Sequence, residues 1–236
     1  TSRSYLRGHT RRHVLHVEPA GHFPDRIEIV FHTDAVDLTR TLLLSILLYR
    51  DGRAVWRQGT DSGGPVDVAV IELDTKSLPE GDVMRAFEPK HLGHPAHDVQ
   101  VGASLRVVGF PLGFYDTRHS LPVVRHAIIA SSFGVRFQGE GYFLTDARMH
   151  RGMSGAPVVL RVGDPADEAM PWRLLGIHSA RMDMGDRDLV QDETLGLNSA
   201  WYADILMTLT EGDAALSKAE MGPRPASRSA TAPKPA

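Results

Sequence analysis

Short runs of β-branched and long apolar residues, separated by turn-forming residues, limit the folds that this sequence can adopt. One such run, residues 41–50, ends at Asp51-Gly52, and a further apolar segment follows at once. Both positions of a two-residue hairpin turn need a positive φ, which Asp and Gly tolerate, so this dipeptide predicts a β-hairpin. The other predicted strands are residues 27–32, 68–73, 105–110, 123–131, 142–144, 157–162 and 172–179.

A single helix is expected, close to the end of the chain. Asn198 or Ser199 suits its N-cap position. The apolar residues that would then share one helical face are Trp201, Tyr202, Ile205 and Leu209. Many short strands with one helix predict an all-β protein, built as a sandwich or as a pair of barrels.

The composition excludes several classes of protein and of partner. The chain has 236 residues, a formal net charge of -3 and no cysteine. We therefore expect no nucleic-acid partner, no disulfide and no cysteine-bound metal. The longest apolar run, residues 42–48, is too short to span a membrane, and no signal peptide is visible after Thr1. Together these features favour a cytoplasmic protein without a membrane partner.

The segment Arg151-Gly152-Met153-Ser154-Gly155-Ala156-Pro157 has the properties that a nucleophilic serine requires. Such a serine needs an exposed hydroxyl and backbone N–H groups that face the oxyanion formed on attack. Gly152 can adopt the backbone angles that turn its N–H inward, and Ser154 supplies a second N–H. The same residues also suit an ordinary turn that leads into a strand.

This segment resembles the G-x-S-G-x-P signature of trypsin-like serine peptidases. Residues 142–147 (YFLTDA), 107–114 (VVGFPLGF) and 127–131 (AIIAS) are similar to the bacterial branch of that family, which includes the Deg-type proteases. The resemblance covers most of residues 10–210. It implies a chymotrypsin-like fold of two six-stranded antiparallel β-barrels with a C-terminal helix. It also implies a serine endopeptidase that acts on polypeptide substrates without a cofactor.

In that family a histidine, an aspartate and a serine follow one another along the chain as a catalytic triad. Thr10-Arg11-Arg12-His13-Val14 resembles the segment that contains the catalytic histidine, and Asp67 precedes an apolar run as the family's aspartate does. The resemblance therefore implies His13 as general base, Asp67 as its orienting carboxylate and Ser154 as nucleophile. An alternative role for Asp67 is to close the turn at Pro65.

The resemblance also implies residues that contact the substrate. Residues 174–179 resemble the strand that pairs with the substrate backbone, and Ser179 would lie near Asp67. His178 resembles the histidine with which glutamyl endopeptidases contact an acidic side chain. By the same resemblance, Arg148 lies near the floor of the pocket that holds the substrate side chain before the scissile bond. We therefore predict a preference for Glu or Asp before the scissile bond. Arg181 stands at the pocket mouth, where many relatives have glycine.

Two features depart from the family pattern. Met153 replaces the aspartate that receives the new N-terminus in zymogen-type trypsins. Few residues precede His13, so the first barrel is expected to be incomplete. The expected divisions are an N-terminal barrel part carrying His13 and Asp67 (residues 1–98), a C-terminal barrel carrying Ser154 (residues 99–215) and a disordered tail (residues 216–236).

Three other interpretations of these residues compete with a serine peptidase. The cluster His91, His94, His97 and Asp98 contains Gly93 and Pro95, so it cannot occupy one helix, and a solvated loop is favoured over a zinc site. An α/β-hydrolase would need G-x-S-x-G and the order Ser, Asp, His, but residue 156 is Ala and only His178 follows Ser154. The alternative that stays open is an inactive or truncated chymotrypsin-fold protein that serves as a scaffold or binding module.

Overall fold

The computed structural model describes residues 24–79, 83–93, 99–162, 170–182 and 195–210, together with the backbone of residues 5–10. The predicted tail, residues 216–236, and the predicted base His13 lie outside the described residues. Within these residues no helix has the length and the apolar character that crossing a membrane requires.

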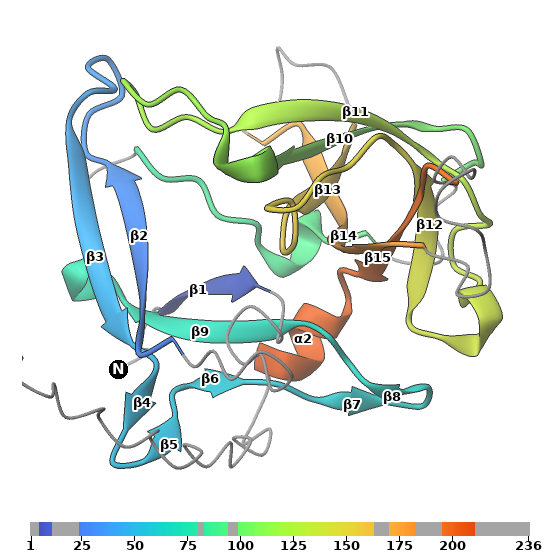
Figure 1. Cartoon of the computed structure of the whole chain (residues 1–236), viewed down its shortest axis with the longest axis horizontal. Coiled ribbons are helices and arrows are strands. Elements are labelled where there is room, and N and C mark those ends of the chain that lie inside the picture. Colours follow the sequence, from blue (N-terminus) through green and yellow to red (C-terminus); the bar gives the residue numbers. More distant parts are fainter. Residues whose placement is uncertain are drawn as a thin grey trace, which may run out of the picture.

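The first half of the chain forms separate antiparallel sheets (Figure 1). A three-stranded sheet has the order β1 (Tyr5–Thr10), β9 (Ala69–Asp74) and β6 (Trp56–Arg57). The two-stranded sheets are β2 (Arg26–His32) with β3 (Thr41–Leu47), β4 (Tyr49–Arg50) with β5 (Arg53–Ala54), and β7 (Thr60–Asp61) with β8 (Gly64–Pro65). In their shared core Leu48, Trp56 and Ala69 are fully buried, and Ala54, Ile71 and Leu73 are nearly so.

The predicted hairpin at Asp51-Gly52 is confirmed. Asp51 has φ 51° and Gly52 has φ 73°, and the two residues join β4 directly to β5. The strand that was predicted to run through residues 41–50 is interrupted at Leu48. The Leu48 side chain is fully buried, and its N–H donates to the carbonyl of Asp25 at 2.8 Å. Tertiary packing at this residue therefore divides the predicted strand into β3 and β4.

The second half forms a closed six-stranded barrel with the order β10-β11-β12-β15-β14-β13. Its strands are β10 (Ser104–Gly109), β11 (Val123–Ile129), β12 (Tyr142–Asp146), β13 (Pro157–Arg161), β14 (Trp172–Arg181) and β15 (Leu197–Tyr202). Alternate residues of each strand point into the barrel, and Leu105, Val107, Ile129 and Phe143 are completely buried there. The predicted all-β class with a C-terminal helix is confirmed.

The short helices of the described residues connect these strands. They are the 3₁₀ turns η2 (Thr75–Ser77), η3 (Pro89–His91), η4 (Pro111–Gly113) and η5 (Phe137–Gly139), and the α-helix α2 (Ile205–Thr210). The expected start of the terminal helix is wrong. Trp201 and Tyr202 belong to strand β15, which hydrogen-bonds to both β12 and β14 and so closes the barrel. These ladder bonds outweigh the local helical pattern of the sequence.

The two halves of the chain share one apolar cluster. Val66, Val68 and Val70 from the first half pack with Val159, Leu174, Ile177 and Trp201 of the barrel, and with Ala203 and Leu209 at the chain's end. An ion pair of 2.8 Å between Arg136 and Asp61 also joins the halves. The strands that flank Asp67 are thereby held against the strand that contains His178.

Candidate active site

Ser154 lies in a tight turn between β12 and β13 that depends on two glycines. Gly152 has φ 89° and Gly155 has φ 82°, a region of backbone conformation that other residues rarely adopt. The Ser154 side chain is half-buried, while Gly152 is exposed. Among the described residues the N–H of Gly152 has no hydrogen-bond acceptor, whereas the N–H groups of Met153 and Gly155 are both bonded. The turn therefore leaves a backbone donor available beside the serine.

The loop that follows β10 packs against this turn and hydrogen-bonds to it. The N–H of Leu112 donates to the carbonyl of Arg151 at 2.6 Å, and a Cβ atom on Gly152 would overlap the carbonyl oxygen of Phe110. Position 152 therefore requires glycine for two independent reasons, its φ and the close approach of Phe110. Leu112 itself has φ 55°, a costly conformation for a leucine, which the contact with Arg151 holds in place.

Strand β14 holds the other side of the turn. The N–H of Gly155 donates to the carbonyl of His178 at 2.9 Å, and the N–H of His178 donates to the carbonyl of Ala156 at 2.9 Å. These reciprocal bonds fix the backbone after Ser154 against the predicted substrate-binding strand. The structure thus brings Ser154, His178 and Ser179 into one region.

Met153, which stands where zymogen-type trypsins have an aspartate, packs in the core of the barrel. Its side chain is completely buried in the barrel core, and its sulfur lies 3.0 Å from the position that a Cβ atom on Gly109 would occupy. A charged side chain at this position would be buried in an apolar environment at a large cost in free energy. Methionine instead locks the turn to the barrel by packing.

Asp67 is placed by the apolar residues on either side of it. Val66 and Val68 are 1% and 0% exposed and belong to the cluster that contains Ile177 of β14, while Asp67 itself is half-buried. Ser179 lies two residues beyond Ile177 on β14 and is also buried. The apolar cluster therefore holds the backbone on either side of Asp67 against strand β14.

The remaining predicted contact residues differ in their environment. His178 is 3% exposed, whereas Arg148 and Arg181 are exposed at the surface. The carbonyl of Arg148 accepts a hydrogen bond of 2.6 Å from Arg125, and among the described residues neither Arg148 nor Arg181 forms an ion pair. Only His178 of these three lies inside the barrel.

Two buried polar residues that the sequence analysis did not assign to the site lie on the same interior face of the barrel as His178. Asn198 and Thr145 are directly paired across β15 and β12, and both are 0% exposed. The side-chain amide of Asn198 donates to the carbonyls of Ala147 at 2.7 Å and Gly196 at 3.0 Å. Because both partners are acceptors, the NH₂ group must point toward them, and Asn198 thereby fixes the segment that leads to Arg148. No local sequence pattern distinguishes this asparagine from a helix cap.

Metal binding finds no support in the described part of the chain, where no group of three His, Cys, Asp or Glu residues could hold an ion. Of the histidine cluster considered above, His91 is described and its Nδ1 accepts a hydrogen bond from the N–H of Glu88. His94, His97 and Asp98 lie outside the described residues.

Comparison with known families agrees with this architecture. A family model described as the trypsin-like peptidase domain matches residues 10–164, which is more than half of the chain. The chain belongs to the trypsin-like peptidase domain family. The range that this family model matches contains His13, Asp67 and Ser154. A comparison with curated proteins finds no match.

Two solved structures are among those similar to the chain. An HtrA-type protease, an AlgW variant with a tripeptide, is 18% identical with a TM-score of 0.42, and the match covers 83% of this chain and 62% of that one. An inactive form of Rv3671c from M. tuberculosis H37Rv is 17% identical with a TM-score of 0.38, with 79% and 75% covered. This chain therefore spans less than two thirds of the length of the first.

Proposed function

We propose that this trypsin-like peptidase domain is a serine endopeptidase in which Ser154 is the nucleophile, His13 the general base and Asp67 the orienting carboxylate. The N–H groups of Gly152 and Ser154 would form the oxyanion hole. The observation that carries the proposal is the turn at Ser154. Gly152 has φ 89° and an N–H group without an acceptor among the described residues, as a donor kept for an oxyanion requires.

The proposed reaction proceeds through an acyl-enzyme. The Ser154 hydroxyl oxygen attacks the scissile carbonyl carbon while its proton passes to the His13 imidazole, and the resulting oxyanion accepts hydrogen bonds from the two N–H groups. The carbon–nitrogen bond then breaks, and the leaving amine takes the proton from His13. Water gives a proton to His13 as it attacks the ester carbonyl carbon. The ester C–O bond then breaks, the carboxylic acid is released, and the Ser154 oxygen takes the proton back from His13. Asp67 holds the imidazole in the required tautomer throughout.

We further propose that the residue before the scissile bond is preferably Glu or Asp. Support comes from His178, which resembles the histidine of glutamyl endopeptidases, and from the buried polar side chains of Thr145 and Asn198, which make the same interior face of the barrel polar. Arg148 precedes Ser154 by six residues in the segment that Asn198 holds, and its positive charge favours an acidic side chain nearby. Ser179 and Arg181 would border the same substrate strand.

A fluorophosphonate probe tests the nucleophile directly, since it reacts covalently only with an activated serine. We expect the wild-type chain to be labelled and the Ser154→Ala variant not to be. His13→Ala and Asp67→Asn should each reduce the labelling rate by several orders of magnitude. Ser104→Ala is the matched control, because Ser104 is an exposed serine on β10 of the same barrel. No labelling of a soluble, folded wild-type chain would favour the scaffold alternative.

A digest of a peptide library tests the substrate preference. We expect cleavage after Glu and Asp, and a relative loss of these products in the His178→Ala and Arg148→Ala variants. Because Arg148 is exposed, Arg148→Ala should change selectivity without changing thermal stability. Cleavage after apolar or basic residues, with indifference to acidic ones, would contradict the acidic preference while leaving the peptidase activity intact.

A further inference from the structure

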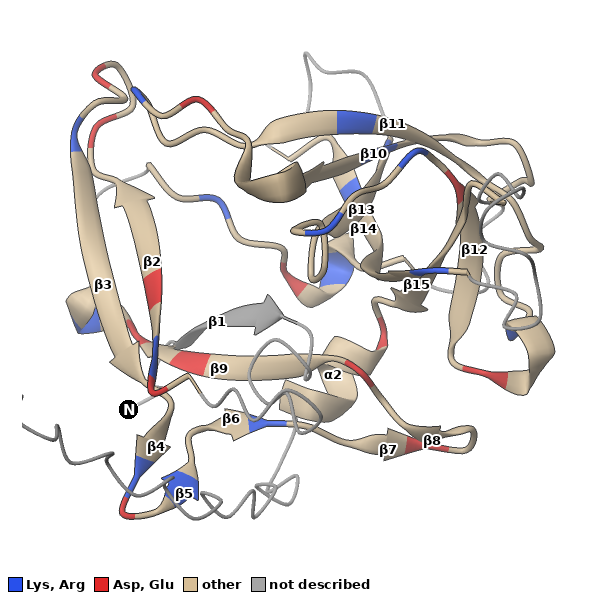
Figure 2. Cartoon of the chain, in the orientation of Figure 1, with Lys and Arg blue, Asp and Glu red and all other residues tan. Residues whose placement is uncertain are grey.

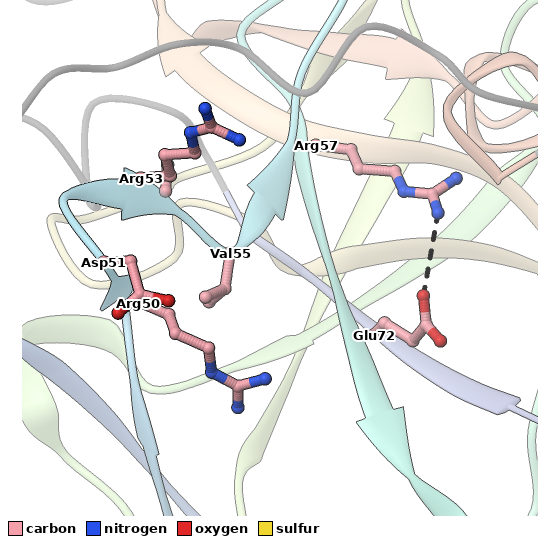
Figure 3. A pocket seen from close by; sticks show the side chains of 7 residues that line it. Arg50, Asp51, Arg53, Val55, Arg57 and Glu72 are labelled. Carbon is pink, nitrogen blue, oxygen red and sulfur yellow. Dashed lines mark ion pairs between the residues drawn. The ribbon is translucent and has the colours of Figure 1, made fainter.

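A pocket of about 440 Å³ on the first half of the molecule is lined by three arginines (Figure 3). The lining residues are Arg50, Asp51, Arg53, Ala54, Val55, Arg57 and Glu72. They lie on β4, β5, β6 and β9 and on the short connections between β4, β5 and β6. Figure 1 shows β4 and β5 well apart from β13, which follows the Ser154 turn, and from β14, which hydrogen-bonds to that turn. Catalysis as proposed above uses none of these residues.

The hairpin forces two of the arginines onto the same outer face. In the β4–β5 register Tyr49 is opposite Ala54, and Arg50 is directly opposite Arg53. Ala54 is buried, and Tyr49 packs edge-on against Trp56 with ring centroids 5.3 Å apart, so this pair faces the core. Successive residues of a strand point to opposite faces, and Arg50 and Arg53 therefore project outward together.

Two like charges directly opposite each other destabilise an antiparallel pair. Within the described residues neither Arg50 nor Arg53 forms an ion pair with a carboxylate. Asp51, in the turn between them, also forms no ion pair there, although it adds one opposing charge to the pocket. Within the described residues, therefore, no salt bridge offsets the repulsion between the guanidinium groups of Arg50 and Arg53.

The third arginine lies on the next strand and completes the pocket. Trp56 is fully buried, so Arg57 faces outward, and it pairs with Glu72 of β9 at 3.6 Å. Figure 3 shows the side chains of Arg50, Arg53 and Arg57 arranged around Val55, with their guanidinium groups pointing in different directions. Figure 2 shows the basic residues following one another along β4, β5 and β6. The pocket therefore has an apolar centre with separated cationic groups at its rim.

We propose that this pocket binds an acidic segment of a polypeptide, with carboxylates at Arg50 and Arg53 and the aliphatic part of a glutamate against Val55. Guanidinium groups bind carboxylates through two parallel hydrogen bonds. Separated guanidinium groups suit several carboxylates spaced along a chain better than one compact phosphate, which would leave the apolar centre uncovered. The site is a second point of contact for polypeptides, and its existence does not depend on the activity at Ser154.

The test is direct binding of a fluorescently labelled hexaglutamate peptide at low ionic strength, measured by anisotropy with the full-length Ser154→Ala chain. Arg50→Ala/Arg53→Ala should weaken binding by at least about tenfold, because two charge-assisted contacts are lost. Arg40→Ala/Arg118→Ala is the matched control, since it removes the same charge from exposed sites elsewhere and should leave binding unchanged.

Two further variants distinguish binding of the peptide at this pocket from a general electrostatic attraction to the protein surface. Asp51→Asn removes the opposing charge at the turn and should tighten binding severalfold, whereas Asp25→Asn, at an exposed aspartate, should not. Arg50→Lys/Arg53→Lys keeps the charge but loses the paired hydrogen bonds, so it should bind more weakly than the parent. It also provides a folded comparison if the alanine variant fails to fold.

Equal binding by the parent and the Arg50→Ala/Arg53→Ala variant would overturn the proposal. Inorganic phosphate is the second probe. If phosphate binds at these arginines and the hexaglutamate peptide does not, the polypeptide is the wrong occupant and the proposal fails. Because every arm uses a chain without the Ser154 hydroxyl, the result is independent of whether the chain hydrolyses peptides.

Discussion

Arg136 and Asp61 form an ion pair of 2.8 Å between the loop that follows β11 and strand β7, and so link the two halves of the molecule. The Asp61 side chain is only 11% exposed, and its other oxygen accepts a hydrogen bond from the N–H of Gly63 at 2.8 Å. The same interface contains the apolar cluster in which Val66 and Val68, on either side of Asp67, pack with Ile177 of β14. The ion pair therefore bears on the alignment of the proposed triad as well as on stability.

We expect Arg136→Ala to lower the free energy of unfolding by about 1–2 kcal/mol, because it leaves a largely buried carboxylate without its cation. Urea denaturation measures this change. Arg118→Ala is the control, since Arg118 is an exposed arginine without an ion pair among the described residues, and it should change stability by less than about 0.5 kcal/mol. Equal effects of the two substitutions would show that the apolar cluster alone holds the halves together.

Gly152→Ala should reduce the rate of fluorophosphonate labelling and of peptide hydrolysis by at least about a hundredfold. The new methyl group would overlap the Phe110 carbonyl oxygen and displace the proposed oxyanion donor. Gly102→Ala is a closely matched control, because Gly102 has φ 85° and nothing within 4 Å of an added Cβ. It should cost about 1–2 kcal/mol of stability and leave the rate unchanged. An active Gly152→Ala chain would contradict the oxyanion role.

Asn198→Asp should destabilise the barrel by about 3 kcal/mol or more at neutral pH. The substitution places a buried carboxylate against the carbonyls of Ala147 and Gly196, which Asn198 now satisfies through its NH₂ group. Asn198→Ala removes the bonds without adding charge and should cost about 1–3 kcal/mol. Urea denaturation at neutral and acidic pH distinguishes the two, since protonation should relieve only the aspartate variant. A neutral effect of both would show that Asn198 does not fix this segment.

Stability should decrease at alkaline pH because of Tyr202. Burial raises the pKa of the Tyr202 phenol, whose oxygen accepts from the N–H of Gly134 at 2.9 Å and whose hydroxyl donates to the carbonyl of Val135 at 3.2 Å. A raised pKa means that the folded chain retains the proton longer than the unfolded chain. Stability is therefore complete below the unfolded pKa of about 10 and is lost as the pH rises toward the folded value.

Tyr202→Phe should remove this part of the alkaline decrease, at a cost of about 1 kcal/mol at neutral pH from the lost hydrogen bonds. Thermal unfolding followed across alkaline pH measures both effects. Burial also raises the pKa of Tyr49 and Tyr142, so part of the decrease should remain in the variant. An unchanged pH profile would show that Tyr202 ionises as easily in the folded chain as in the unfolded one.

The terminal helix shows where local pattern and tertiary structure disagree. The spacing of Trp201, Tyr202, Ile205 and Leu209 suits one face of a helix, yet the helix begins only at Ile205. Residues 197–202 instead supply the strand that closes the barrel between β12 and β14. The partners of that strand lie far away in the sequence, so no window around residue 198 could reveal them.

The buried polar residues and the arginine pocket could not be predicted from the sequence either. Thr145 and Asn198 are distant along the chain and become neighbours only through the β12–β15 register. Arg50 and Arg53 flank a turn that was predicted, but their outward face follows from Ala54 and Tyr49 facing the core. Both features depend on which face of a strand is covered, and that choice is made by the packing of other elements.

Turn chemistry is local, and for this reason the sequence by itself determined the hairpin at Asp51-Gly52, the glycine-rich turn at Ser154 and most of the strands. A positive φ at Gly152 is a property of the residue and its immediate neighbours. The tertiary structure alone decided what supports that turn, namely the Phe110–Leu112 backbone behind it and His178 beside it. Those contacts join segments far apart in the chain, and only the closure of the barrel brings them within hydrogen-bond distance.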